Sequence, residues 1–179
     1  MQAAHQGWRH IARVIDWVCG IWDQPDEGIW ETRGGRKDFT YGWFQTWVAV
    51  DRADPMWIST LEAMDRELVS DSLIYRYNPA ASPDGLAGDE GTFSLCTFWY
   101  VEALAPRRAL DEARLTFEKM HTYANHLGLY SEEIGSTGEQ LGNFPQAFSH
   151  LALISAAINL DYQLDHGAGM AGPVLSRAR

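Results

Sequence analysis

The 179-residue sequence is poor in cysteine, in basic residues and in long apolar runs, and each deficit argues against a class of protein. Its two cysteines, Cys19 and Cys96, provide no disulfide framework, and each follows an apolar residue, where a free thiol acts as a small hydrophobic side chain. With 14 basic against 24 acidic residues the net charge is −10, so a phosphate backbone is an unfavourable partner and we expect no nucleic acid. No apolar run is long enough to span a bilayer, and the N-terminus has no uninterrupted apolar core. We therefore expect a cytoplasmic protein without a membrane partner.

Motifs for metal-dependent and nucleotide-dependent chemistry are also missing. The sequence contains no HExxH, no GxSxG, no P-loop and no GxGxxG. Its six histidines show no metal-ligand spacing, because His121 and His126 are five positions apart and diverge on a helix without a third ligand. We expect no metal and no cofactor.

What the sequence does contain is helical periodicity. Hydrophobic residues make up 46% of the chain and aromatic residues 12%, which is enough for the core of a single domain. Apolar residues recur every three or four positions around residues 8–22, 40–53, 61–68, 110–127 and 145–164, and strand signals are nearly absent, which predicts an all-α protein. Residues 92–104 are apolar on almost every side, as in an inner, buried helix. We expect a domain over residues 1–166 and a disordered tail over residues 167–179.

Two carboxylates lie in breaks between helical stretches. Glu31 belongs to the glycine-rich run at residues 27–35, and Glu132 follows Ser131. Glycoside hydrolysis needs such a pair, because one carboxyl donates a proton to the leaving oxygen and the other, ionised, activates water. Structural alternatives remain: Glu31 as a helix-terminal carboxylate that binds Arg33 or backbone amides, and Glu133 as the base in place of its neighbour.

The sequence around these carboxylates resembles glycoside hydrolase family 15, the glucoamylase and bacterial trehalase family. The matching stretches are residues 25–53, 73–104 and 127–158, with the words GIWE and SEE at the two turns. The resemblance implies an (α/α)6 toroid and the inverting hydrolysis of α-glucosidic bonds in trehalose or malto-oligosaccharides. It assigns the general acid to Glu31 and the general base to Glu132, since the glutamate directly after the serine holds that role in the family motif.

Candidate substrate-binding residues surround the pair. Arg76 matches a substrate-contacting arginine of fungal family members, and its alternative is a surface salt bridge. Trp30 and Trp99 are candidates to stack on sugar faces, although most tryptophans in a helical core are structural. Arg33 completes the set. A loop of turn formers at residues 78–91 has a length typical of functional or disordered loops, and the resemblance places the substrate against such loops at the mouth of the ring.

Two departures from the family pattern lead to a second interpretation. The sequence begins at what resembles the middle of the ring, and residue 53 runs directly into a segment that lies several helices later in the family. About six helices are predicted, where a closed (α/α)6 ring has about twelve. A partial toroid leaves apolar side chains in water, and each of them forgoes roughly 1.5–3 kcal/mol of burial free energy. This loss favours self-association through exposed inner helices. We therefore expect an open arc with Phe93, Phe98 and Trp99 near its unclosed edge. The alternative function is that of a catalytically inactive remnant or a helical interaction module.

Overall fold

The computed structural model describes residues 55–79, 90–105 and 109–167, together with a few isolated positions between residues 13 and 24. The predicted helix at 40–53, the GIWE turn and the tail beyond residue 167 lie outside these residues. Within them, the chain is mostly helical, which confirms the all-α class; the toroid stays a prediction. The helices are α3 (Pro55–Glu67), α4 (Ser94–Leu104), α5 (Leu110–His121) and α6 (Ala147–His166).

Five strands of two residues each join the helices. The strands β1 (Val69–Ser70) and β2 (Leu73–Ile74) form an antiparallel hairpin directly after α3. The other three form an antiparallel sheet in the order β3-β4-β5, with bounds Thr92–Phe93, Glu133–Ile134 and Gln140–Leu141. Such short strands carry no periodic signal, so the sequence did not predict them.

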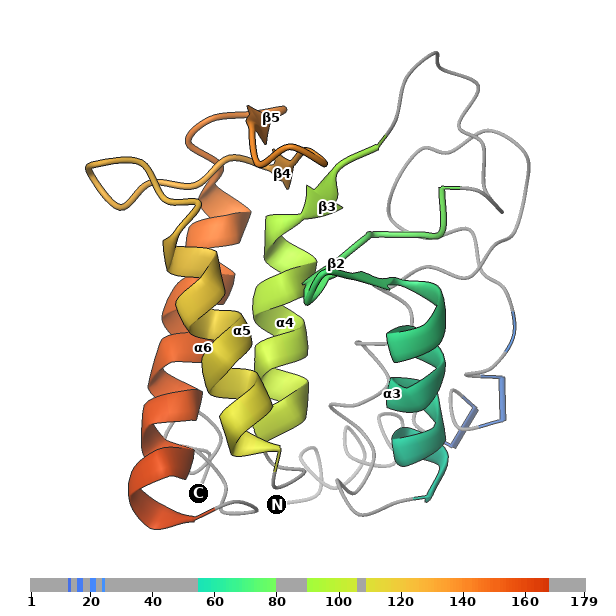
Figure 1. Ribbon diagram of the computed structural model, residues 1–179. Coiled ribbons are helices and arrows are strands. Elements are labelled where there is room, and N and C mark those ends of the chain that lie inside the picture. Colours follow the sequence, from blue (N-terminus) through green and yellow to red (C-terminus); the bar gives the residue numbers. More distant parts are fainter. Residues whose placement is uncertain are drawn as a thin grey trace, which may run out of the picture.

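The helices α4, α5 and α6 lie side by side and alternate in direction (Figure 1). The helix α4 packs against both α5 and α6, while α3 is joined to it through the β1–β2 hairpin. The three-stranded sheet lies at the end of this bundle where α4 and α6 begin. This end therefore collects the loops that connect the helices.

The helix α4 is the buried centre of the described structure, as its sequence predicted. Nine of its eleven residues are buried, and the Phe98 ring meets the rings of Phe117 and Tyr130 edge-on, with centroid distances of 6.1 and 5.3 Å. The expectation of an unclosed edge here was wrong for Phe93 and Phe98, which are 3% and 0% exposed because α5, α6 and β2 pack against α4. Only Trp99 remains partly exposed.

The apolar stripe at residues 110–127 is longer than the helix it predicted. The helix α5 ends at His121, and Leu127 lies exposed beyond it. The side chain of Asn125 accepts hydrogen bonds from the backbone N–H groups of Leu127 and Leu129, both at 2.9 Å, and Gly128 adopts φ +75°. This turn replaces helical hydrogen bonds with side-chain ones, so apolar spacing alone could not locate the helix end.

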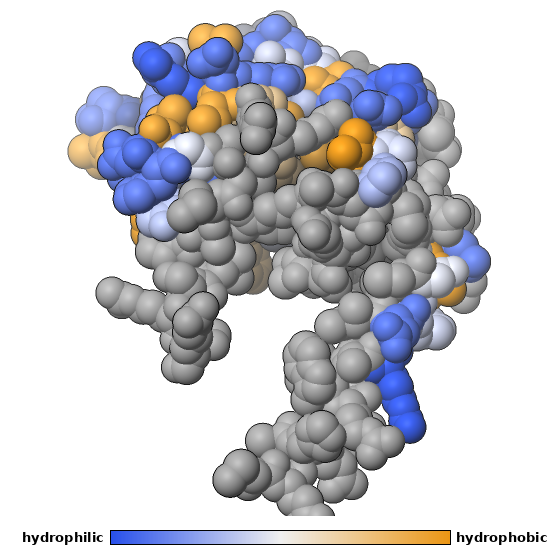
Figure 2. Space-filling view, turned by 90° about the horizontal axis from the view of Figure 1, so that it is seen from below, coloured by the Kyte–Doolittle hydropathy of each residue, from blue (hydrophilic) through white to orange (hydrophobic). Residues whose placement is uncertain are grey.

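The helix α6 has two apolar faces with different surroundings. One face is buried against α4 and α5 and includes Ala152, Ala156 and Leu160. The opposite face, here called the exposed face of α6, is in solvent and consists of Phe148, Leu151, Ile154 and Ile158. Seen from the lower end of the bundle, hydrophobic residues lie among hydrophilic ones on the described surface (Figure 2). None of the described helices is long and apolar enough to cross a membrane.

Candidate active site

Glu132 lies immediately before β4, at the end of the bundle where α4 and α6 begin. Its backbone is held from two sides. The N–H of Ser94, the first residue of α4, donates to the Glu132 carbonyl at 3.0 Å, and the Glu132 N–H donates to the Asn143 carbonyl at 2.9 Å. The position of this residue is therefore set by a helix start and by the chain segment that follows β5.

The carboxylate of Glu132 is held through one oxygen. Its Oε2 accepts hydrogen bonds from the backbone N–H of Asn143 at 3.1 Å and from the Asn143 side-chain Nδ2 at 2.8 Å. Within residues 55–79, 90–105 and 109–167, no donor is assigned to Oε1, and the side chain is partly exposed. A carboxylate with one oriented oxygen and one accessible oxygen has the arrangement that proton abstraction from water requires.

The neighbouring carboxylate of Glu133 has a different environment. Its Oε1 lies 3.6 Å from a terminal guanidinium nitrogen of Arg76, and its Oε2 accepts a hydrogen bond from the Gly91 N–H at 3.3 Å. Burial, followed by the negative charge of Glu90, raises the pKa of Glu133 to about 7, although Arg76 acts in the opposite direction. The two adjacent glutamates therefore have different partners: Asn143 for Glu132, and Arg76 and Gly91 for Glu133.

Arg76 forms a partly buried ion pair rather than the surface salt bridge that was its structural alternative. Its Nε pairs with Glu90, and the Tyr77 hydroxyl donates to the other oxygen of that carboxylate. The guanidinium carbon also lies 5.4 and 5.5 Å from the ring centroids of Tyr77 and Phe93. A fifth of the Arg76 side chain remains exposed, and contact of this residue with substrate stays a prediction.

Sequence reasoning missed Glu90 and Asn143 as members of this region. Glu90 closes the long loop of turn formers, and Asn143 follows β5, where neither residue shows a periodic or motif signal. Trp99, a predicted sugar-stacking residue, packs against the core from α4 and is partly exposed. Glu31, Trp30 and Arg33 lie outside the described residues.

The first residues of α6 support the loop that carries Glu132. The Gln146 N–H donates to the Tyr130 carbonyl at 3.0 Å, and the Ser149 hydroxyl donates to the Ser131 carbonyl at 3.3 Å. The Tyr130 N–H donates to Nε2 of His150 at 3.3 Å, while Nδ1 of this ring lies 2.6 Å from the Gln146 carbonyl. These contacts assign the proton of the neutral ring to Nδ1. The loop before Glu132 is therefore joined to α6 through both backbone and side chains.

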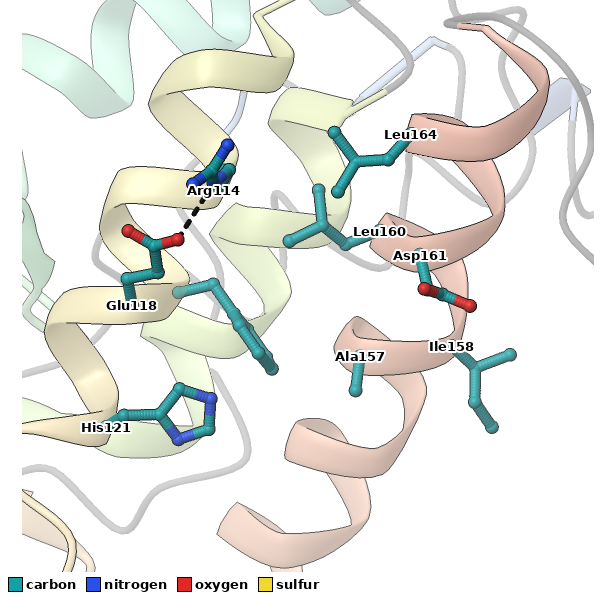
Figure 3. Close-up of a pocket in the computed structure, with 9 residues that line it drawn as sticks. Arg114, Glu118, His121, Ala157, Ile158, Leu160, Asp161 and Leu164 are labelled. Atoms are coloured by element: carbon teal, nitrogen blue, oxygen red, sulfur yellow. Dashed lines mark hydrogen bonds and ion pairs between the residues drawn. The ribbon is translucent and has the colours of Figure 1, made fainter.

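A groove of about 550 Å³ lies between α5 and α6, away from Glu132. Leu160 and Leu164 extend toward α5, where Arg114 is paired with Glu118 (Figure 3). The α6 residues that line this groove begin at Ala157, ten positions after the start of the helix, which is about 15 Å along its axis. None of the residues that line the groove contacts the Glu132 carboxylate, although His121 among them lies 3.1 Å from the hydroxyl of Tyr130. In the part of the chain that the structure describes, no group of histidine, cysteine and acidic side chains could hold a metal ion.

Comparison with known proteins identifies the class of this carboxylate-bearing helical bundle. The sequence profile of Glycosyl hydrolases family 15 matches residues 1–57 and 51–158, and the chain belongs to this family. A trehalase of Mycolicibacterium smegmatis is 31% identical over 217 residues, covering 86% of this chain and 32% of that protein. Trehalases of Mycobacterium tuberculosis and Thermoplasma volcanium are each 30% identical, covering 86% and 88% of this chain and 32% and 35% of their own lengths. No solved structure matches the chain.

These alignments also confirm an internal loss. The chain spans about one third of the length of these relatives. An alignment of 217 residues is longer than the 179-residue chain, so the relatives carry residues within the matched region that this chain lacks. The two profile matches meet at residues 51–57, where the sequence predicted the loss.

Proposed function

We propose that this chain carries the acid–base pair of an inverting glycoside hydrolase that cleaves α-glucosidic bonds. Trehalose is the first substrate to test, because the relatives named above are trehalases, and malto-oligosaccharides are the second. The observation that supports the proposal most is the carboxylate of Glu132, which is held through one oxygen by Asn143 in a loop at the end of the helical bundle.

In the proposed reaction Glu31 donates a proton to the glycosidic oxygen while the bond from this oxygen to the anomeric carbon breaks. Glu132 takes a proton from a water molecule, whose oxygen attacks the anomeric carbon from the opposite face. The glucose unit that carries this carbon is therefore released with inverted configuration, while the leaving sugar takes the proton on its oxygen and keeps its own configuration. The two carboxyl groups should lie roughly 6.5–9.5 Å apart, which leaves room for the water.

The remaining candidates have binding roles in this proposal. Trp30 and Trp99 stack on sugar faces, and Arg33 and Arg76 donate hydrogen bonds to sugar hydroxyls. The pairing of Arg76 with Glu90 restricts the guanidinium to one orientation, which supports a positioning role toward a neutral ligand. The proposed reaction uses no metal and no cofactor, and we place the protein in the cytoplasm.

Substitution of the two glutamates tests this function. We expect Glu31→Gln and Glu132→Gln each to abolish glucose release from trehalose. Followed by NMR, the unsubstituted chain should initially release α- and β-glucose in equal amounts, because water inverts only the attacked anomeric carbon. Glu118→Gln is the matched control, because this exposed carboxylate pairs with Arg114 on α5, away from the candidate site. Turnover that persists in both glutamate variants would contradict the proposal.

A second candidate function is that of a catalytically inactive remnant that acts as a helical interaction module. Two observations favour it: the residues missing from the matched region, and the exposed face of α6. In this case the chain self-associates through apolar surface, and sedimentation should show a mass that rises with protein concentration. Leu151→Lys on the exposed face should then restore the monomer, while Glu31→Gln and Glu132→Gln should leave any residual glucose release unchanged.

A further inference from the structure

We propose that Asn143 is the positioning residue of Glu132: it holds one oxygen of the carboxylate so that the other faces the reacting water. This proposal rests on the role of Glu132 as the general base. Asn143 itself touches neither substrate nor water in the proposed reaction, so its effect passes entirely through the glutamate.

The contact between the two residues is reciprocal. Asn143 donates to Oε2 of Glu132 twice, from its backbone N–H at 3.1 Å and from Nδ2 at 2.8 Å. In return, the Glu132 N–H donates to the Asn143 carbonyl at 2.9 Å. Three hydrogen bonds therefore connect the same pair of residues, and side-chain rotation of Glu132 would break two of them.

The preceding glycine makes this contact possible. Gly142 adopts φ +71°, and a Cβ at this position would lie 2.9 Å from Oε2 of Glu132 and 3.0 Å from its Cβ. A larger residue would have to displace the carboxylate. Gly142 and Asn143 together form a backbone surface against which the Glu132 side chain lies, directly after β5.

Fixing the carboxylate in this way has a specific chemical use. Both assigned donors bind the same oxygen, which leaves the lone pairs of Oε1 for a water molecule. A general base acts only from hydrogen-bond distance, and a misplacement of about 1 Å can cost about 100-fold in rate. A freely rotating glutamate would spend most of its time outside this geometry.

The kinetic test compares two asparagines that each donate a side-chain hydrogen bond from Nδ2 to a glutamate. Asn159 on α6 donates from Nδ2 to Oε1 of Glu102 at 2.6 Å, outside the candidate site, so Asn159→Ala is the matched control. We expect Asn143→Ala to lower kcat on trehalose by about 10- to 100-fold with KM nearly unchanged, and Asn159→Ala to retain the original kcat. Asn143→Asp should move the acidic limb of the pH–rate profile to higher pH, because a second negative charge then faces Glu132. Equal kcat values in the two alanine variants would overturn the proposal.

A second readout does not depend on turnover. In amide NMR spectra, the Asn143 side-chain resonances should move in Glu132→Gln and stay in place in Glu102→Gln, while the Asn159 side-chain resonances should do the reverse. If the unsubstituted chain releases no glucose, the proposed function fails, and this measurement alone decides whether Asn143 holds Glu132. Asn143 resonances that are indifferent to Glu132→Gln would overturn the proposal in either case.

Discussion

At the scale of single residues, two glycines with almost the same backbone conformation provide a clean comparison. Gly142 and Gly128 adopt φ +71° and +75°, but only a Cβ on Gly142 would meet another side chain, that of Glu132. We expect Gly128→Ala to lower the free energy of unfolding by about 1–2 kcal/mol through backbone strain alone. Gly142→Ala should cost more, because it adds the clash with the carboxylate. Urea unfolding of both variants measures the difference, and equal losses would mean that the carboxylate does not lie against Gly142.

Glu133 gives the molecule a dependence on pH. Its folded pKa of about 7 exceeds the ordinary value of 4.5, so between these values the folded state binds more protons than the unfolded state. The free energy of unfolding must therefore fall as the pH rises through this window. Arg76 stays charged throughout and also pairs with Glu90, so it offsets only part of the increase that burial causes in the pKa of Glu133.

Glu133→Gln should remove this loss, because the amide stays neutral. The free energy of unfolding of the variant, relative to that of the unsubstituted chain, should rise by about 1–2 kcal/mol from pH 5 to pH 8. This value allows for solvent screening of a partly exposed group. This corresponds to about 2–8 °C in Tm, which thermal unfolding at the two pH values can measure. A constant difference in Tm between variant and parent would show that Glu133 titrates as an ordinary carboxyl.

The site residues differ in how far the sequence could predict them. The family resemblance selected Glu132 over Glu133, and the structure gives the two side chains separate environments. Asn143 reaches Glu132 across eleven positions of the sequence through a hairpin, and Glu90 reaches Arg76 from the far end of a loop. Neither contact has a periodic signature, because turns rather than repeats bring these residues together.

At the scale of helices, α6 contains its own internal control. Leu160 is 4% exposed on the face packed against α4 and α5, whereas Leu151 is 62% exposed on the opposite face. We expect Leu160→Ala to lower the free energy of unfolding by about 2–4 kcal/mol, since it leaves a cavity. Leu151→Ala should change it by less than about 0.5 kcal/mol. Urea unfolding at low protein concentration checks both values, and a large loss in Leu151→Ala would show that its face is covered in solution.

The sequence predicted a helix correctly where burial determines the apolar pattern. It did not predict where a helix ends. The all-round apolar sequence of α4 correctly indicated a helix enclosed by its neighbours. The stripe at residues 110–127 continues past the end of α5. There Thr122 and Tyr123 donate backbone hydrogen bonds to carbonyls three residues back, and the turn that follows does not interrupt the apolar spacing. Periodicity records which residues are apolar, while the end of a helix depends on single hydrogen bonds.

At the scale of the whole molecule, the internal loss leads to a prediction about rate. Contacts remote from the scissile bond align a substrate for attack, and this chain lacks residues that its relatives carry within the matched region. We expect kcat/KM on trehalose to be at least about 100-fold below that of the Mycolicibacterium smegmatis trehalase. Parallel assays of the two purified proteins decide this, and comparable values would mean that the missing residues are dispensable for catalysis.

The sequence predicts single helices better than it predicts whether helices form a ring, for a physical reason. The local spacing of apolar residues predicts each helix, whereas a toroid depends on packing between helices that are distant in the chain. The described helices α4, α5 and α6 are consecutive in the chain, but α4 packs most extensively against α6, across α5 and the β4–β5 hairpin.

The hydrogen bond from the Ser94 N–H to the Glu132 carbonyl has a consequence for motion over minutes to hours. Amide protons of the enclosed helix α4 should exchange with solvent only when the whole domain opens, whereas those of exposed turns exchange through local fluctuations. The Ser94 amide belongs to the first turn of α4 and is also a partner of the Glu132 loop. The exchange rate of the Ser94 amide therefore measures how often the loop that carries Glu132 detaches from α4.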